Sequence, residues 1–151
     1  MSTDYIRAEL RRLVASRADH VCEYCLIHSE DTFFGCEIDH VVSEKHGGLS
    51  LEDNLAYACL VCNRNKGSDI ASIVPGTREL VRLFNPRTDR WRDHFRLGLD
   101  GTTIESLTEI GEATARILGF NAAERLLERR ALLQAGRYPT PGARKRIEET
   151  R

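Results

Sequence analysis

Four of the five cysteines form two matched pairs, Cys22-x-x-Cys25 and Cys59-x-x-Cys62, which are separated by 33 residues. Two such turns can aim four thiolates at one point, and four thiolates enclose a tetrahedral Zn²⁺ ion with no open position. The spacing therefore predicts a structural zinc site. An iron ion in the same site and four unrelated buried cysteines stay open as alternatives. Two redox pairs are disfavoured because no βαβ unit surrounds either motif, and Cys36 is expected to be a small buried side chain.

The segment between and beside these pairs contains polar residues in a definite order. It reads Asp39-His40, then Gly47-Gly48, then Asn54-Leu55, and finally Cys62-Asn63-x-x-Lys66. Taken singly, an Asp-His pair is more often a surface pair, and lone asparagines are ordinary turn or cap residues. Only their ordered occurrence around the two cysteine pairs points to catalysis.

The full pattern resembles the HNH endonucleases of the ββα-metal nuclease group, and the resemblance runs from Cys22 to about Gly67. Asn63 stands where the family has its last histidine, which makes the chain an HNN variant. The resemblance implies that Asp39 and Asn63 hold a catalytic metal ion. It also implies that Asn54 holds the intervening loop and orients His40.

Phosphodiester hydrolysis needs an activated water and a cation that stabilises the developing negative charge. His40 is suited to be the general base because an imidazole titrates near neutral pH. One carboxylate and one amide oxygen form a hard, sparsely liganded site, so we expect Mg²⁺ or Mn²⁺ to act there in preference to Zn²⁺. Arg64 and Lys66, which follow Asn63 within one helical turn, are expected to contact flanking phosphates.

Elements of the first half must position these residues. We expect an amphipathic helix over residues 4–18, strands over 33–42 and 55–59, and a short helix over 62–71, with Pro75-Gly76 closing the unit. Neighbouring residues on a strand face opposite sides. Asp39 and His40 can therefore reach one phosphate only if their strand ends, twists or bulges there.

The second half carries a hairpin signal at Asp100-Gly101 and two helical patterns, over 108–118 and 122–134, with a frayed tail from about residue 139. Its arginine-rich segment, 78–96, interleaves arginines with Phe84, Trp91 and Phe95. We expect the aromatic residues to pack in the core rather than to stack on bases. The arginines are expected to contact phosphates, and the candidates are Arg87, Arg90 and Arg92. Four leucines, Leu126, Leu127, Leu132 and Leu133, either pack on the core or form a homodimer.

The chain has 151 residues, 41% of them hydrophobic and 30% charged, which fits one globular domain or a small domain with an appendage. Its net charge is -1, yet residues 1–75 carry 7 basic and 12 acidic residues while residues 76–151 carry 15 and 11. This balance argues against a nonspecific polycation. No apolar run is long enough to span a membrane, and residues 1–12 lack the apolar core of a signal peptide, so we expect a cytoplasmic protein.

Together these observations predict an α+β protein. A zinc-stapled ββα-metal unit over residues 1–75 is framed by an N-terminal helix, and a basic accessory region over residues 76–151, built from a hairpin and helices, packs on it. The expected activity is metal-dependent endonucleolytic hydrolysis of DNA. Two other classes stay open: a zinc-stabilised nucleic-acid-binding module without activity, and a zinc-ribbon protein that binds another protein.

Overall fold

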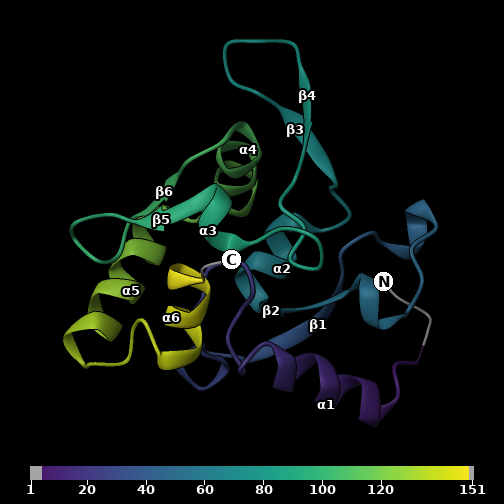
Figure 1. The fold of residues 1–151 in the computed structure, drawn as a ribbon, viewed down its shortest axis with the longest axis horizontal. Coiled ribbons are helices and arrows are strands. Elements are labelled where there is room, and N and C mark those ends of the chain that lie inside the picture. Colours follow the sequence, from purple (N-terminus) through teal and green to yellow (C-terminus); the bar gives the residue numbers. More distant parts are fainter. Residues whose placement is uncertain (1–4, 150–151) are drawn as a thin grey trace.

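A two-stranded hairpin followed by a short helix forms the centre of the molecule (Figure 1). In this computed structural model, which describes residues 5–149, strand β1 (Cys36–His40) pairs antiparallel with β2 (Leu55–Cys59). Helix α2 (Leu60–Lys66) follows β2 directly. The long connection between the strands contains two single 3₁₀ turns, Glu44–His46 and Glu52–Asn54.

The N-terminal part supports this hairpin from one side. Helix α1 (Ala8–Arg17) lies along β1 and β2, and Val14 packs with Ile6 and Leu55 in a small apolar cluster. Between α1 and β1 the chain makes the first cysteine turn, which an isolated bridge between Val21 and His28 closes, and then a 3₁₀ turn over Ser29–Asp31. The two cysteine pairs are thereby brought to the same end of the hairpin, because the amide of Glu23 in the first cysteine turn donates to the carbonyl of Tyr57 on β2, two residues before Cys59.

From residue 71 onward the chain adds two further hairpins and most of the helices among the described residues, and its part from residue 76 on is the accessory region. A hairpin of β3 (Ala71–Ile73) and β4 (Leu80–Arg82) projects from the body (Figure 1). The elements that follow are α3 (Trp91–His94), β5 (Phe95–Leu97), β6 (Ile104–Ser106), α4 (Glu109–Leu118), α5 (Ala123–Gln134) and α6 (Pro141–Glu148). Strands β5 and β6 pair antiparallel.

One apolar core joins the two halves of the chain. It contains the four paired cysteines together with Phe84, Trp91 and Phe95, all three of which are at most 3% exposed. The indole nitrogen of Trp91 donates to the carbonyl of Tyr24, which holds α3 against the first cysteine turn. The expectation that these aromatic residues pack in the core is confirmed.

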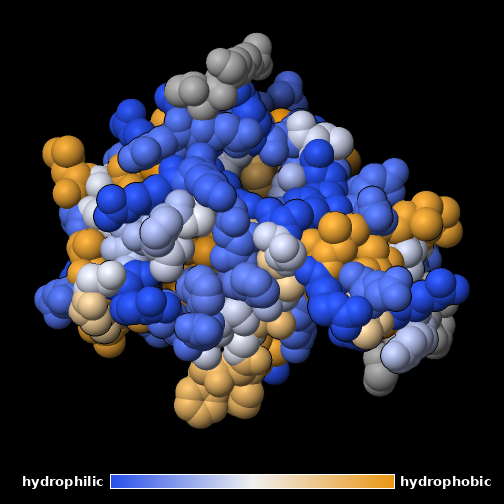
Figure 2. Space-filling model, turned by 60° about the horizontal axis from the view of Figure 1, so that its bottom comes forward, coloured by the Kyte–Doolittle hydropathy of each residue, from blue (hydrophilic) through white to orange (hydrophobic). Residues whose placement is uncertain are grey.

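The surface is mostly polar, with separated apolar patches visible on the face shown in Figure 2. Phe33 and Leu99 are among the most exposed large apolar side chains. Leu127 and Leu133 on α5 are also exposed, whereas Leu132 packs against the core. Among the described residues, no helix combines the length and apolarity that a membrane span requires.

Several predicted elements agree with the structure. The chain is a mixed α+β protein, the second strand covers Leu55–Cys59 as expected, and the Asp100-Gly101 turn joins β5 to β6. Helix α4 begins after Thr108, whose hydroxyl accepts from the Gly111 amide, and it ends at Gly119. Both boundaries follow from ordinary cap chemistry.

Other expectations are wrong in extent. The first helix begins at Ala8, and Asp4, where it was predicted to start, lies outside the described residues. Strand β1 begins only at Cys36, because Gly35 has a φ of 72° and the preceding Phe33 and Phe34 are turned outward. The helix expected to run to residue 71 ends at Lys66, since Gly67 caps it with a positive φ.

Two predictions for the second half are also corrected. Pro75-Gly76 does not close a unit but lies in the turn of the β3–β4 hairpin, whose strands are too short to show an alternating pattern. The tail is not frayed from residue 139. Thr140 caps helix α6, Pro141 occupies its first turn, and Arg146 binds Asp19 and the carbonyl of Arg17.

Candidate metal centre and active-site cleft

The four paired cysteines converge on one buried point. Their sulfurs all lie within 4.8 Å of one another, and each side chain is at most 1% exposed. Zn–S bonds of about 2.3 Å at tetrahedral angles separate sulfurs by about 3.8 Å, and the Sγ atoms of Cys25 and Cys59 lie 3.7 Å apart. This arrangement can bind a metal ion such as zinc. Convergence of both pairs also disfavours two independent redox pairs and four unrelated cysteines.

Backbone amides support the sulfurs in both turns. The Cys25 amide lies 3.5 Å from Cys22 Sγ and donates to it, and the Cys62 amide donates to Cys59 Sγ at 3.4 Å. Such donors stabilise thiolates, as metal ligation requires. Because Cys59 is also the N-cap of α2, the cysteine cluster fixes the start of that helix. Cys36 is half-buried beside the cluster, and burial raises the pKa of its thiol well above the ordinary value.

A cleft of about 640 Å³ opens beside this centre, at the junction of β1 and α2. Its walls include Glu37, Asp39, His40, Glu44 and Asn63. The structure thus brings together three of the four residues for which a catalytic role was expected. Asp39 and His40 both line the cleft, and β1 ends at His40, which is one of the conditions under which two neighbouring strand residues were expected to reach one phosphate.

Asp39 is 6% exposed and sits in a polar cage. Its Oδ2 lies 3.1 Å from Nζ of Lys66 and accepts a hydrogen bond from the Tyr24 hydroxyl at 3.3 Å. Lys66 is 2% exposed and also donates to the backbone carbonyl of His40 at 3.0 Å. Burial raises the pKa of Asp39 above its ordinary value, and the ammonium of Lys66 opposes that rise.

His40 is almost buried and its imidazole has two polar neighbours. Nε2 lies 2.8 Å from the hydroxyl of Ser50 and 3.7 Å from a carboxylate oxygen of Glu44. Both neighbours come from the connection between β1 and β2. A hydroxyl and a carboxylate at one ring nitrogen restrict the orientation of the ring, as a positioned acid–base group requires.

Asn63 is oriented by a residue that the sequence interpretation missed. Its Nδ2 donates to Oε2 of Glu37 at 2.7 Å. A carboxylate only accepts, so the amide nitrogen faces Glu37 and Oδ1 remains for a cation. Glu37 lies two residues before Asp39 on β1 and therefore on the same side of the strand, which is the signal that could have identified it.

The side chain of Asn54 hydrogen-bonds to the backbone of the connecting loop. Its Oδ1 accepts from the Val42 amide, and its Nδ2 donates to the carbonyls of Val42 and Leu49, each at 2.9 Å. Gly48 must be a glycine, because a Cβ there would lie 1.7 Å from the Val42 carbonyl oxygen and 2.8 Å from Nδ2 of Asn54. Asn54 and the Gly47-Gly48 turn thus together stabilise the loop that carries Ser50.

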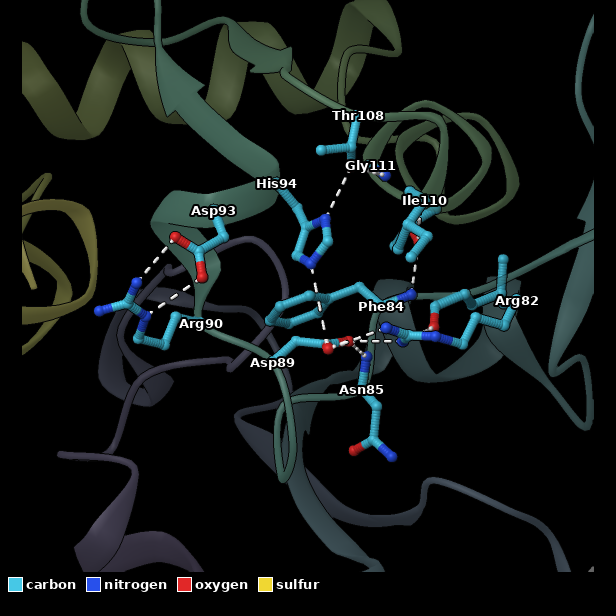
Figure 3. A network of polar contacts seen from close by, with 12 residues as sticks. Arg82, Phe84, Asn85, Asp89, Arg90, Asp93, His94, Thr108, Ile110 and Gly111 are labelled. Atoms are coloured by element: carbon cyan, nitrogen blue, oxygen red, sulfur yellow. Dashed lines mark hydrogen bonds and ion pairs between the residues drawn. The ribbon is translucent and has the colours of Figure 1, made fainter. Parts of the chain in front are cut away.

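The five basic residues considered for phosphate contact lie in different surroundings. Arg64 is exposed and follows Asn63 at the cleft, whereas Lys66 is turned inward to Asp39. Arg87 pairs with buried Glu23, Arg90 makes a two-pronged pair with Asp93 (Figure 3), and Arg92 donates to the carbonyls at the end of α6. Of these five, Arg64 is the one that is both exposed and next in sequence to a residue of the cleft.

The local sequence therefore determines which elements carry the residues of the cluster and of the cleft. The second cysteine pair lies at the start of α2, Asn63 on that helix lines the cleft, and the hairpin supplies Asp39 and His40. Residues 22–69 match the family model described as HNH endonuclease, and that segment contains every cysteine of the cluster and all the cleft residues named above. Comparison with curated proteins and with solved structures finds no match. An HNH domain implies a function related to nucleic acids.

Proposed function

Residues 22–69 carry an HNH endonuclease domain, and from this premise we propose that the protein is a metal-dependent endonuclease that hydrolyses phosphodiester bonds in DNA. The observation that carries the proposal is the meeting of Asp39, His40 and Asn63 at one cleft. An imidazole beside two hard oxygen donors is what metal-assisted hydrolysis of a phosphodiester needs. A protein that only binds nucleic acid has no use for that combination.

The donor set of the cleft fits a Mg²⁺ or Mn²⁺ ion. Asp39 offers a carboxylate and Asn63 an amide oxygen whose nitrogen is already engaged by Glu37. Both are hard donors, and two protein ligands leave room for waters and a phosphate oxygen. When bound, such an ion supplies positive charge to the phosphate as it is attacked.

Residues of the chain itself would remove the proton, position the reacting groups and bind the flanking phosphate. His40 removes a proton from the attacking water at its imidazole, and Ser50 and Glu44 keep the ring in place. Lys66 holds the Asp39 carboxylate and the backbone of His40 in one geometry. Asn54 acts through the loop that presents Ser50, and Arg64 is the candidate for a flanking phosphate.

The four-cysteine cluster is proposed to hold a structural Zn²⁺. All four positions are protein sulfurs, so no site is left for water or substrate. Catalysis and folding would then use two different metals, one hard and exchangeable and the other enclosed by thiolates.

A supercoiled plasmid tests the nuclease proposal. The expected result is nicking in Mg²⁺ or Mn²⁺ that EDTA stops and that His40→Ala removes, with zinc content and melting curve unchanged. His46→Ala, which alters an exposed histidine in the same connection, is the matched control and should cleave normally. Full activity in His40→Ala would contradict the proposed base.

A catalytically inactive nucleic-acid-binding module is the second candidate, and one observation favours it. The ammonium of Lys66 already stands beside Asp39, where a catalytic cation would also bind. This candidate predicts DNA binding that weakens steeply with salt, without cleavage under any metal condition. The plasmid assay combined with a salt titration of DNA binding separates the two.

A further inference from the structure

The accessory region covers the four-cysteine centre directly. Helix α5, which begins about 60 residues after the last of the four cysteines, places Arg125 over it. Nη2 of Arg125 lies 3.0 Å from Cys25 Sγ and 3.4 Å from Cys59 Sγ. The arginine side chain is only 5% exposed, so its charge faces the sulfurs instead of water.

The charge of this arginine requires a buried counter-charge. A guanidinium stays protonated in proteins, and removing it from water is costly unless negative groups surround it. One carboxylate, that of Glu128, lies 2.9 Å from Nη1, and its side chain is 31% exposed. Four thiolates around a divalent ion carry two negative charges in excess. The negative charge of such a centre would balance the positive charge of Arg125. Four neutral thiols would instead leave Nη2 of Arg125 beside weakly polar sulfur atoms, without a counter-charge.

Two more residues of the accessory region hold the first cysteine turn, at its backbone. The hydroxyl of Tyr138 donates to the carbonyl of Cys25 at 2.9 Å, and the indole of Trp91 donates to the carbonyl of Tyr24 at 2.8 Å. Both donors are buried. The accessory region therefore binds the backbone of the turn as well as its sulfurs.

We propose that Arg125 is the counter-ion of the metal–thiolate centre and that it makes retention of the metal depend on the accessory region. Arg125 is a positioning residue: it acts through the sulfurs of Cys25 and Cys59 and ligates no metal itself. The inference rests on the zinc assignment made above but not on nuclease activity. Outer-shell partners of this kind commonly change metal affinity by about 10- to 100-fold.

Transfer of zinc from the intact, zinc-loaded protein to a chromophoric chelator tests the proposal. Arg125→Met keeps the aliphatic length and removes the charge, and we expect release to become about tenfold faster or more. Arg125→Lys restores a cation and should recover part of the retention. Arg129→Met is the matched control, because Arg129 lies one turn further along α5, is fully buried, and donates to the carbonyls of Thr102 and Phe120 and not to sulfur.

Replacing the zinc by cobalt gives an absorption band whose energy does not change when the protein is merely destabilised. A cation at the sulfurs stabilises their lone pairs, so the thiolate-to-cobalt charge-transfer band of Arg125→Met should shift to lower energy. The band of Arg129→Met should stay in place. Equal acceleration of zinc release in the two methionine variants with unshifted bands would overturn the proposal. Absence of zinc from the wild-type protein would overturn it as well, whatever the outcome of the plasmid assay.

Discussion

The cysteine centre and the cleft beside it share the same hairpin and helix but are built in opposite ways. At the centre, four sulfurs meet in a fully buried cluster that residues of the accessory region cover. At the cleft, Asp39, His40 and Asn63 line an open cavity of about 640 Å³. A closed set of four soft ligands suits a metal that stays in place, whereas few hard ligands with free space suit one that works on substrate.

A single helical turn serves both sites. In α2, Cys62 is fully buried at the cluster, Asn63 lines the cleft, and Lys66 is buried against Asp39, which also lines the cleft. Because Cys59 caps this helix, the cluster fixes the origin of the segment that carries the cleft residues. The dependence runs one way: loss of the centre should destroy the cleft, and changes in the cleft should leave the centre intact.

The largest effect is expected from Cys59→Ala. Binding of a structural metal is folding free energy, so removal of one ligand should abolish both zinc content and the cooperative melting transition. Cys36→Ala is the control, because Cys36 pairs with Cys59 across the hairpin but stands outside the cluster. A native melting curve for zinc-free Cys59→Ala would remove the structural role of the centre.

The next effect is expected at the buried ion pair of the cleft. Lys66→Met should lower the free energy of unfolding by about 3–5 kcal/mol, because the Asp39 carboxylate is left buried without its cation. Denaturant titration measures this loss, and zinc content should not change. Lys45→Met, an exposed lysine at the same cleft, serves as control.

Two further results sharpen the interpretation of Lys66→Met. The double variant Asp39→Asn/Lys66→Met should regain much of the lost stability, because the uncompensated charge is gone. Added Mg²⁺ should raise the melting temperature of Lys66→Met more than that of the wild type, since a bound cation replaces the ammonium beside Asp39. If Lys66→Met had the same free energy of unfolding as the wild type, the Asp39–Lys66 ion pair would not stabilise the cleft.

A smaller effect on stability is expected from Asn54, whose hydrogen bonds hold the connecting loop. Asn54→Ala removes three hydrogen bonds, leaves backbone groups of Val42 and Leu49 without their partner, and should cost about 2 kcal/mol of stability. The loop also carries Ser50, so a displacement of His40 should lower plasmid cleavage by about a hundredfold. Asn65→Ala, which removes one bond to the carbonyl of Leu118, should leave cleavage unchanged.

How much the sequence reveals differs between these sites. The cysteine pairs and the ordered polar residues predicted the resemblance to the HNH endonucleases that the family model matches over residues 22–69, because short spacings on a hairpin and a helix start determine where those side chains meet. The inward orientation of the Lys66 side chain was not predicted, since a lysine one turn into a helix is ordinarily solvated. It became internal because buried Asp39 needs a cation.

Contacts that join distant parts of the chain were beyond the reach of sequence patterns. Arg125 reads as a charged helix residue, and only the folded chain brings it to sulfurs 66 and 100 residues away. Helix α6 was missed although Thr140-Pro141 is a normal helix start, because its few apolar residues resembled a frayed tail. The β3–β4 hairpin was missed because three-residue strands carry almost no periodicity.

The smallest effect is expected at an ion-pair network of the accessory region whose residues belong neither to the cysteine cluster nor to the cleft lining. Asp89 accepts from Arg82 and from the Asn85 amide, with His94 on its other side (Figure 3). Burial alone would raise the pKa of Asp89, but these partners outweigh it and hold that pKa below the ordinary value. Asp89→Asn should therefore cost about 1 kcal/mol near neutral pH.

That loss should depend on pH in one direction. Because the folded-state pKa of Asp89 is depressed, its charge stabilises the protein above the pKa of an unfolded aspartate, about 3.9. The contribution disappears as the pH falls through the lower folded value. Denaturant titrations of wild type and Asp89→Asn should thus converge in acid, while Asp93→Asn, at a more exposed pair with Arg90, changes stability less at neutral pH. A difference that widened below pH 4 would contradict this assignment, and zinc content should be equal in all three proteins.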